Sequence, residues 1–540
     1  MQKKISIQVL PEEAINNGLL SIKIGQACNV NPSSVNGFYT ERESIDARSR
    51  EVKVNLTLQA FIDEPFQQRP LQIFQFRDVH HATNRIVIIG AGPAGLFAAL
   101  LCLEKGIQPI ILERGKDVKS RRRDLALLNK EGIINAESNY CFGEGGAGTY
   151  SDGKLYTRSS KRGDVHRILN LLVHFGAEEK ILYQAHPHIG TNKLPQIISA
   201  MRKQITDAGG KFIFEKKVTS FSIEKDHIKA VHTADGDTFQ GDAFLLATGH
   251  SARDIFVMLR DMEIKIEAKP FALGVRIEHP QSLIDQMQYH CNPKTGRKEL
   301  LPPASYQLIE QVEARGVFSF CMCPGGIIAT ASTAPGELVV NGWSPSKRNN
   351  PFANSGMVVQ VDVGDALRYF KKEHKKNATP IPDEKDPLLL VAFQESIEKK
   401  AFVAGGGKFV APAQRMLDFT RRITSTSLPE CSYIRGIHSV DLGTVLPDYI
   451  NRALQEGFKS FGKKMKGYLT NEAVLVATES RTSSPVRIPR DTEKLCHPQI
   501  QNLYPCGEGA GYAGGIVSAA MDGERVAAAI MAKMNARSIE

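Results

Sequence analysis

The chain has 540 residues, of which 42% are hydrophobic and 23% are charged. That composition is ordinary for a folded globular protein, and the length predicts two to four domains. The formal net charge is +10, but the basic residues are dispersed, and no basic stripe with interleaved aromatic side chains indicates a nucleic-acid surface. An odd count of nine cysteines favours reduced thiols over a disulfide framework.

The first part of the chain predicts a small α+β domain over residues 1–62. The expected elements are a strand, a helix and two further strands, over residues 5–10, 19–28, 35–44 and 52–61. A proline-containing linker over residues 63–84 is expected to follow.

The most informative pattern follows this linker. An apolar run breaks into Gly90, Gly92 and Gly95, and a second apolar run ends at Glu113. The pattern predicts a strand–loop–helix–strand unit that binds a dinucleotide. Gly90 permits the tight turn, Gly92 lets a pyrophosphate approach the backbone, and Gly95 lets the helix pack closely on the strand. Pro93 suits the first helical turn, and Glu113 is expected to accept hydrogen bonds from a ribose.

No segment predicts export or membrane insertion. Residues 1–15 lack the hydrophobic core of a signal peptide. Residues 86–103 are uncharged and approach the length of a membrane span, but the nucleotide-binding pattern accounts for their glycines and proline. We therefore expect a cytoplasmic protein.

The next segments predict the remainder of the nucleotide-binding domain. A helix is expected over residues 194–205, followed by strands over 211–214, 218–223, 228–233 and 243–246. The last strand runs into Ala247-Thr248-Gly249. From residue 267 to about residue 433 the pattern changes to mixed strands and helices, which predicts an inserted substrate or cap domain.

A second glycine-rich motif, Gly507-Glu508-Gly509-x-Gly511-x-x-Gly514-Gly515, precedes an alanine-rich helix. Residues 515–540 leave no room for a second strand with a terminal acid, so we do not expect a separate NAD site. Glu508 is instead expected to accept from a ribityl hydroxyl, while the following helix points its N-terminus at the same ligand. Two motifs so far apart would converge on one long molecule, and FAD has the length to need both.

Several blocks of the sequence resemble a bacterial family of FAD-dependent dehydrogenases within the flavoproteins that have two dinucleotide-binding domains. The blocks lie at residues 44–48, 90–95, 142–155, 320–326 and 506–515. The resemblance runs from the first strand to the last helix. It implies non-covalent FAD and an inserted catalytic or cap domain, and it names no substrate.

The glycine-rich block from Phe142 to Leu155 is the expected flavin loop, since its glycines let the backbone approach a flat ring. Lys154 in this loop is a candidate for stabilising the reduced flavin, against the alternative of a solvated lysine in a turn. Cys321 and Cys323 are candidates for a redox role beside the flavin, which requires a lowered thiol pKa. The alternative is that they are small buried apolar residues. No His-x-x-x-His or Cys-x-x-Cys pair predicts a metal.

The expected fold class is α/β, with a discontinuous Rossmann-like FAD-binding domain over residues 85–266 and 434–540, an inserted α+β domain over 267–433, and the N-terminal α+β domain. The expected function is an FAD-dependent oxidoreductase, a dehydrogenase or reductase that transfers a hydride or electrons between flavin and a small-molecule substrate, with NAD(P)H as a candidate transient donor. The alternatives are an RNA-modifying flavoprotein and a non-catalytic flavin-dependent binding or scaffold protein. The sequence does not predict the oligomeric state.

The predicted cofactor-binding residues are Gly90, Gly92, Pro93, Ala94, Gly95, Glu113, Arg114, Gly145, Gly146, Gly148, Ser151, Val218, Thr248, Gly249, Gly507, Glu508, Gly514, Gly515 and Ile516.

Overall fold

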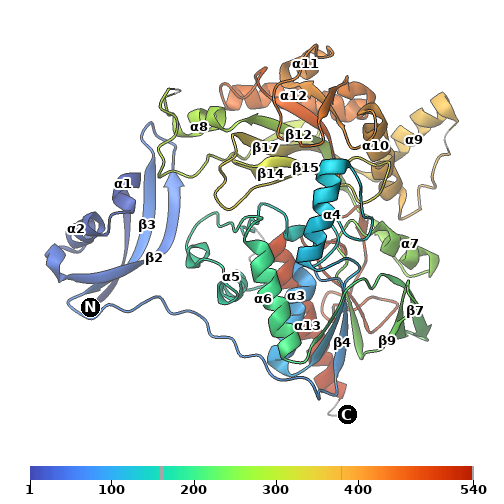
Figure 1. The fold of residues 1–540 in the computed structure, drawn as a ribbon, viewed down its shortest axis with the longest axis horizontal. Coiled ribbons are helices and arrows are strands. Elements are labelled where there is room, and N and C mark those ends of the chain that lie inside the picture. The colour runs from blue at the N-terminus through green and yellow to red at the C-terminus, as the bar shows by residue number, and fades with distance from the viewer. Residues whose placement is uncertain (158–162, 293, 379, 538–540) are drawn as a thin grey trace.

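The computed structural model describes residues 1–157, 163–292, 294–378 and 380–537. It contains three main sheets, each with its own hydrophobic core (Figure 1). The N-terminal unit lies at one side, the parallel sheet with its helices lies below, and the largest sheet lies above them in the view of Figure 1.

The N-terminal unit is a three-stranded antiparallel sheet, in the order β1-β3-β2, that packs against a helix. Its core joins apolar residues of the strands to Leu20 and Ile24 of the helix. The expected order of strand, helix, strand, strand is confirmed, with a short extra helix before the long one. The elements are β1 (Gln2–Val9), α1 (Pro11–Ala14), α2 (Asn17–Cys28), β2 (Val35–Asp46) and β3 (Lys53–Ile62).

The predicted linker contains neither helix nor strand and runs along the outside of the next domain (Figure 1). It is not a free tether, because Phe74 and Val79 are buried in that domain's core. The N–H of Val79 also donates to the carbonyl of Ala208 at 2.7 Å.

A parallel five-stranded sheet, in the order β22-β10-β4-β5-β6, forms the centre of the second unit. Its strands are β4 (Arg85–Ile89), β5 (Gln108–Leu112), β6 (Lys211–Ile213), β10 (Ala243–Leu246) and β22 (Leu503–Pro505). Alternate residues of β4 face opposite sides of the sheet: Ile86 and Ile88 pack among the helices, whereas Val87 and Ile89 pack on the other side. The sheet is therefore covered on both faces, as parallel sheets generally are.

Helices α3 and α13 lie side by side on one face of this sheet, although they come from opposite ends of the chain (Figure 1). A Cβ atom at Gly523 of α13 would lie 2.1 Å from the carbonyl oxygen of Ala94 in α3, so only glycine allows this close packing. The two glycine-rich motifs thus belong to one domain, as the sequence predicts. The helices on this face are α3 (Pro93–Lys105), α5 (Val165–His174), α6 (Leu194–Asp207) and α13 (Ile516–Arg537). Elsewhere in the domain lie α4 (Val118–Glu131), α7 (Arg253–Asp261) and the antiparallel sheet of β7 (Val218–Glu224), β8 (His227–Thr233) and β9 (Thr238–Phe239).

The third unit is built on a seven-stranded sheet in the order β13-β14-β17-β12-β20-β18-β19. Its strands are β12 (Phe271–Pro280), β13 (Ile309–Val312), β14 (Arg315–Cys323), β17 (Phe352–Val361), β18 (Ala411–Arg415), β19 (Ile437–Ser439) and β20 (Val474–Glu479). Its helices are α8 (Gln281–Tyr289), α9 (Val363–Asn377), α10 (Leu389–Ala404), α11 (Met416–Arg421) and α12 (Asp448–Lys464). Two short antiparallel pairs are β15 (Ile327–Thr330) with β16 (Val340–Trp343), and β11 (Glu267–Ala268) with β21 (Val486–Arg487).

The boundary of this unit lies later than the predicted residue 433. Strands β19 and β20 and helix α12 all follow that residue, yet they belong to the seven-stranded sheet and its core. The returning strand β20 pairs with both β12 and β18, so it is inserted into the interior of the sheet. The segment that rejoins the parallel sheet therefore begins after Glu479. In the described part of the chain, no helix is long and apolar enough to cross a membrane.

Candidate functional site

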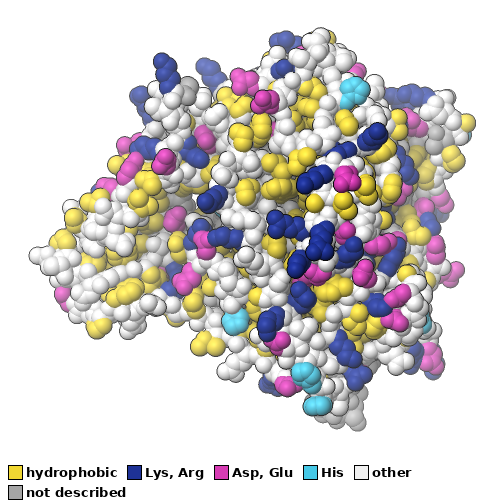
Figure 2. Space-filling model, viewed as in Figure 1, with side chains coloured by type: hydrophobic (Ala, Val, Ile, Leu, Met, Phe, Trp, Pro, Cys, Tyr) yellow, Lys and Arg dark blue, Asp and Glu magenta, His cyan; other side chains and the backbone are white. Residues whose placement is uncertain are grey.

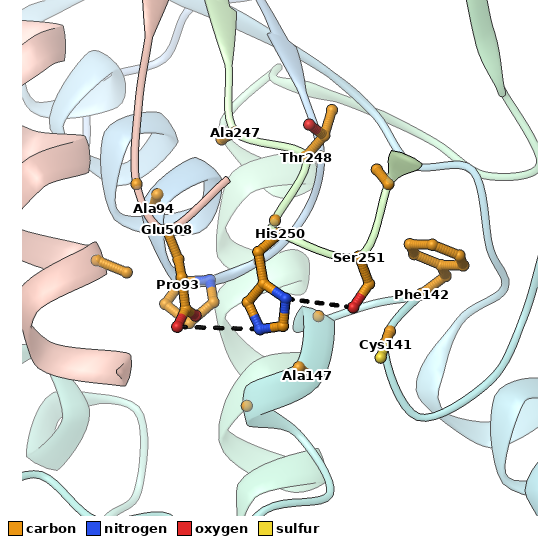
Figure 3. Close-up of a pocket in the computed structure, with 18 of the residues that line it drawn as sticks. Pro93, Ala94, Cys141, Phe142, Ala147, Ala247, Thr248, His250, Ser251 and Glu508 are labelled. Carbon is orange, nitrogen blue, oxygen red and sulfur yellow. Dashed lines mark hydrogen bonds and ion pairs between the residues drawn. The ribbon is translucent and has the colours of Figure 1, made fainter. Parts of the chain in front are cut away.

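A cavity of about 310 Å³ lies at the carboxyl ends of the parallel strands. Its walls include the segments that follow β4, β5, β10 and β22, the glycine-rich loop around residues 146–154, and the end of β14. Figure 3 shows the part of the cavity around Pro93, His250 and Glu508. Ligands of parallel α/β sheets bind at this edge, because the loops there converge and the helix N-termini point into the crevice.

The glycines of the two motifs divide into two groups. Gly90 has φ +107° and would place a Cβ 2.4 Å from the carbonyl oxygen of Ala247, and Gly95 would place one 2.1 Å from the carbonyl oxygen of Gly90. These two are required by the packing of the protein itself. In contrast, a Cβ at Gly92 or Gly514 would meet no atom within 4 Å, and neither residue has a positive φ. The space is equally open at Gly515 and at Gly249, which follows β10, but these two have φ +115° and +72°. Those four leave open space beside exposed backbone, and all four line the cavity.

Two helix N-termini border the same space. Gly92 is the N-cap of α3, Pro93 follows it, and no side chain caps the helix. Ile516 begins α13 directly after the open pair Gly514-Gly515. Free N–H groups and the positive end of the helix dipole favour an anion such as a pyrophosphate at these positions.

Glu113, the predicted ribose acceptor, lines the cavity and holds three loops together. Its carboxylate accepts from the backbone N–H groups of Ala91 at 2.9 Å, Gly115 at 2.8 Å and Gly143 at 2.9 Å. A carboxylate has about four acceptor positions, so a ribose hydroxyl can still donate to it. The neighbouring Arg114 is already paired, since its guanidinium donates to Asp254 at 2.8 Å.

His250, Ser251 and Glu508 lie close together on the cavity wall formed by the segments after β10 and β22 (Figure 3). His250 Nε2 lies 4.0 Å from Glu508 Oε1, and its Nδ1 lies 3.4 Å from Ser251 Oγ. Burial lowers the pKa of His250 to about 4, with the charges of Arg481 and Arg253 adding to the effect. Burial raises the pKa of Glu508 to about 7. At neutral pH the imidazole is uncharged, while the carboxyl can hold or release a proton.

The three predicted catalytic residues meet at the opposite wall. The Lys154 ammonium donates to the backbone carbonyl of Met322, between Cys321 and Cys323 on β14. Cys323 is buried and its thiol donates to the carbonyl of Cys321 at 3.3 Å. Cys321 opens onto the cavity, but the surrounding protein raises the pKa of its thiol to about 12, and burial also raises the pKa of Cys323. Neither thiol has the lowered pKa that the redox hypothesis requires.

The cavity brings together residues from four of the five blocks, whereas the block at residues 44–48 lines a second, adjoining cavity. All of the predicted cofactor-binding residues line it except Gly95 and Gly145. Gly145 has φ +78° and would place a Cβ 2.1 Å from Thr149 Oγ1, so it shapes the loop instead. Asp152 lies in the predicted flavin loop, but sequence reasoning missed its partner Arg348, 2.6 Å away, because the two residues are far apart in the chain.

A second cavity of about 1700 Å³ adjoins the first. It extends between the N-terminal unit and the seven-stranded sheet, and in Figure 2 the surface is hollowed between the N-terminal unit and the rest of the molecule. The residues that line both cavities are Lys154, Phe320, Cys321, Gly514, Gly515 and Ile516. The two spaces therefore meet at one boundary. Among the described residues, no group of three or more His, Cys, Asp or Glu side chains is placed to hold a metal ion.

Solved structures with a similar arrangement are distant from this chain. Tetracycline destructase Tet(51) is 14% identical, with a TM-score of 0.27 over 54% of this chain and 63% of that enzyme, which is just under two thirds of its length. PqsL of P. aeruginosa is 10% identical, with a TM-score of 0.36 over 84% of this chain and 88% of its own. 2,6-Dihydroxypyridine-3-hydroxylase from Arthrobacter nicotinovorans is 10% identical, with a TM-score of 0.34 over 84% of each chain. Similarities this low support no conclusion about the activity.

Sequence families give a firmer result. Residues 83–240 match the model of an FAD binding domain, residues 270–482 match that of an FAD-dependent protein, C-terminal domain-like, and residues 1–61 match a domain of unknown function. A protein of Clostridium beijerinckii, named "Uncharacterized protein", is 38% identical over 541 residues and covers 96% of each chain. The open glycines, the helix N-termini and the buried acid fit a long dinucleotide. The chain belongs with this Clostridium protein to a bacterial family of FAD-dependent oxidoreductases, and FAD is its cofactor.

Proposed function

We propose that the protein is a dehydrogenase or reductase that moves a hydride or an electron pair between FAD in the first cavity and a small-molecule substrate in the second. The boundary that the two cavities share at Lys154, Phe320 and Cys321 carries this proposal. A flavin needs contact with both its own binding site and the reacting molecule, and this boundary is where the two spaces meet. NAD(P)H is the proposed transient donor and would reach the flavin through the same opening.

The chain's own residues have distinct roles in this proposal. Bound FAD supplies the two-electron chemistry. The Lys154 ammonium stands at the boundary, where a positive charge favours a reduced, anionic ring. Glu508, with its pKa raised to about 7 by burial, can hold or release a proton on the far wall. The neutral His250 beside it supplies hydrogen bonding without adding charge.

Anaerobic stopped-flow absorbance of the FAD-loaded protein tests the proposal. The protein is mixed with NADH and, separately, with NADPH, and the oxidised flavin band is followed over time. Saturable bleaching by at least one nicotinamide, followed by reoxidation with an added acceptor, is the expected result. A flavin that dithionite reduces but that neither nicotinamide nor a panel of small-molecule donors can reduce would contradict the proposal and favour a structural flavin.

A further inference from the structure

We infer that the second cavity binds an anionic substrate with an apolar part, and that the N-terminal unit forms the outer wall of this binding site. The inference rests on the proposed function, because it takes the second cavity to be the substrate site. It gives residues 1–62 a role in substrate binding, since one side of the cavity is lined by Ile45, Asp46, Ala47, Arg48 and Asn55 of their hairpin.

The hairpin formed by β2 and β3 is held against the rest of the molecule by several independent contacts. The N–H of Glu43 donates to the carbonyl of Tyr183 at 2.9 Å, and the N–H of Ala185 donates to the carbonyl of Glu43 at 2.9 Å. At the hairpin tip, Val52 is buried within the core of the seven-stranded unit. The apolar residues Ile45 and Ala47 pack against the same core.

A fourth contact crosses the same interface. Lys298, beyond α8, pairs with Glu12 of the N-terminal unit at 2.6 Å. The two backbone hydrogen bonds and the buried apolar tip make the hairpin a fixed wall of the cavity, not a loosely tethered domain, and the exposed ion pair of α1 adds little to this.

Charge on the lining favours an anion. Five lysine or arginine side chains line the cavity against a single carboxylate, Asp46, and the five are Arg48, Lys154, Arg348, Lys464 and Lys466. Some of this charge is compensated nearby: Arg48 pairs with Asp46, Arg348 with Asp152, and Lys464 with Glu310. Lys154 and Lys466 form no ion pair among the described residues, and the ammonium of Lys154 donates instead to the carbonyl of Met322. A surplus of positive charge in a concave space concentrates anionic ligands.

The pKa of His186, near the boundary, is affected by this positive charge. Burial lowers the pKa of His186, and the positive charges of Lys154 and Arg348 lower it further. His186 itself lines the second cavity. The end of the cavity next to the first cavity is therefore positive, and Lys466 adds a further positive charge, whereas the charge of Arg48 is balanced by Asp46.

Apolar side chains lie between the charged positions. Leu283 and Met287 of α8 line the cavity together with Met322 at the end of β14. Met322 follows Cys321, which marks the boundary with the first cavity. This mixture fits a ligand with an acidic group joined to an apolar body, and the volume of about 1700 Å³ gives room for a molecule larger than a simple acid.

A matched pair of probes tests the inference on the FAD-loaded, full-length protein. 8-Anilinonaphthalene-1-sulfonate carries an acidic group on an apolar body, and N-phenyl-1-naphthylamine has the same rings without the charge. Their affinities are measured by calorimetry, and the absorbance of the bound flavin reports whether the probe lies next to it. The test variant carries Arg48→Glu and Lys466→Glu. The control carries Lys3→Glu and Lys375→Glu, an equal change of charge in the same two units at exposed residues outside the cavity.

We expect the sulfonate to bind one site at least about tenfold more tightly than the amine and to perturb the flavin band. The test variant is expected to weaken sulfonate binding about tenfold or more, with little effect on the amine, and the control to weaken it less than about twofold because distant exposed charges are screened. Equal binding of the two probes, or equal loss in test and control variants, would overturn the inference. Flavin reduction by NAD(P)H is measured on the same samples. Charge-selective binding without reduction would contradict the proposed function alone, whereas reduction without charge-selective binding would contradict this inference alone.

Discussion

The two groups of glycines predict opposite effects for the same substitution at Gly92 and Gly95. A methyl group at Gly92 would meet no protein atom within 4 Å, and its backbone, at φ −75° and ψ −177°, is extended and open to any residue. We therefore expect Gly92→Ala to change the free energy of unfolding of the apoprotein by less than about 1 kcal/mol. The methyl group would instead occupy the space that the ligand uses. Forcing one extra methyl into a packed contact costs about 1–3 kcal/mol, which corresponds to a loss of FAD affinity of roughly 5- to 150-fold.

Gly95→Ala is the matched comparison. Its methyl carbon would lie 2.1 Å from the carbonyl oxygen of Gly90 and 3.1 Å from Cγ2 of Ile88, so α3 must move away from β4. The cost of about 1–3 kcal/mol then falls on the apoprotein itself. Urea unfolding measures the free energy of unfolding of each apoprotein variant. Calorimetric titration of the folded apoprotein with FAD measures its affinity for FAD. Wild-type FAD affinity in Gly92→Ala would refute the idea that this glycine leaves space for the ligand. Wild-type apoprotein stability in Gly95→Ala would refute the idea that this glycine is required by packing.

Two further substitutions and one labelling experiment probe the two walls of the cavity. Lys154→Ala is expected to retain FAD but to lower the two-electron midpoint potential by roughly 30 mV, about 1.4 kcal/mol, because a positive charge near the reduced ring is lost; an unchanged potential against a reference dye would remove Lys154 from that role. Cys321 is expected to react with iodoacetamide more slowly at pH 7 than a free cysteine, because its thiol pKa is raised to about 12; rapid labelling seen by mass spectrometry would contradict this. Glu508 binds its proton more tightly in the folded than in the unfolded protein, so the apoprotein loses stability as pH rises from about 4.5 to 7. Glu508→Gln should reduce that loss, and an equal pH dependence of unfolding in wild type and variant would contradict the raised pKa.

The nucleotide-binding motifs were predictable because their residue types are dictated by local geometry. Gly90 needs a positive φ, Gly95 needs close packing, and Pro93 sits where its missing N–H is harmless. The convergence of the last motif on the first was also predictable. A dinucleotide pattern without its second strand indicates a strand that returns to the first sheet, and β22 joins that sheet beside β10.

Other features depend on contacts between distant segments and left no readable signal. The run that forms β20 is visibly apolar, but nothing in it reveals that the strand inserts between β12 and β18, so the domain boundary was placed too early. The thiol pKa of Cys321 depends on how the protein surrounds it, which spacing cannot show. The second cavity draws its walls from the N-terminal hairpin, α8 and the loop after α12, and only the folded arrangement brings these together.

The central claim is that one FAD spans both glycine motifs. Absorbance titration of the apoprotein with FAD tests it most directly, with Gly92→Ala and Gly514→Ala alongside the wild type, since a Cβ at either position meets only open space. We expect one equivalent of FAD to bind, and both substitutions to weaken that same binding event. A second equivalent, no flavin binding, or wild-type affinity in Gly514→Ala would contradict it.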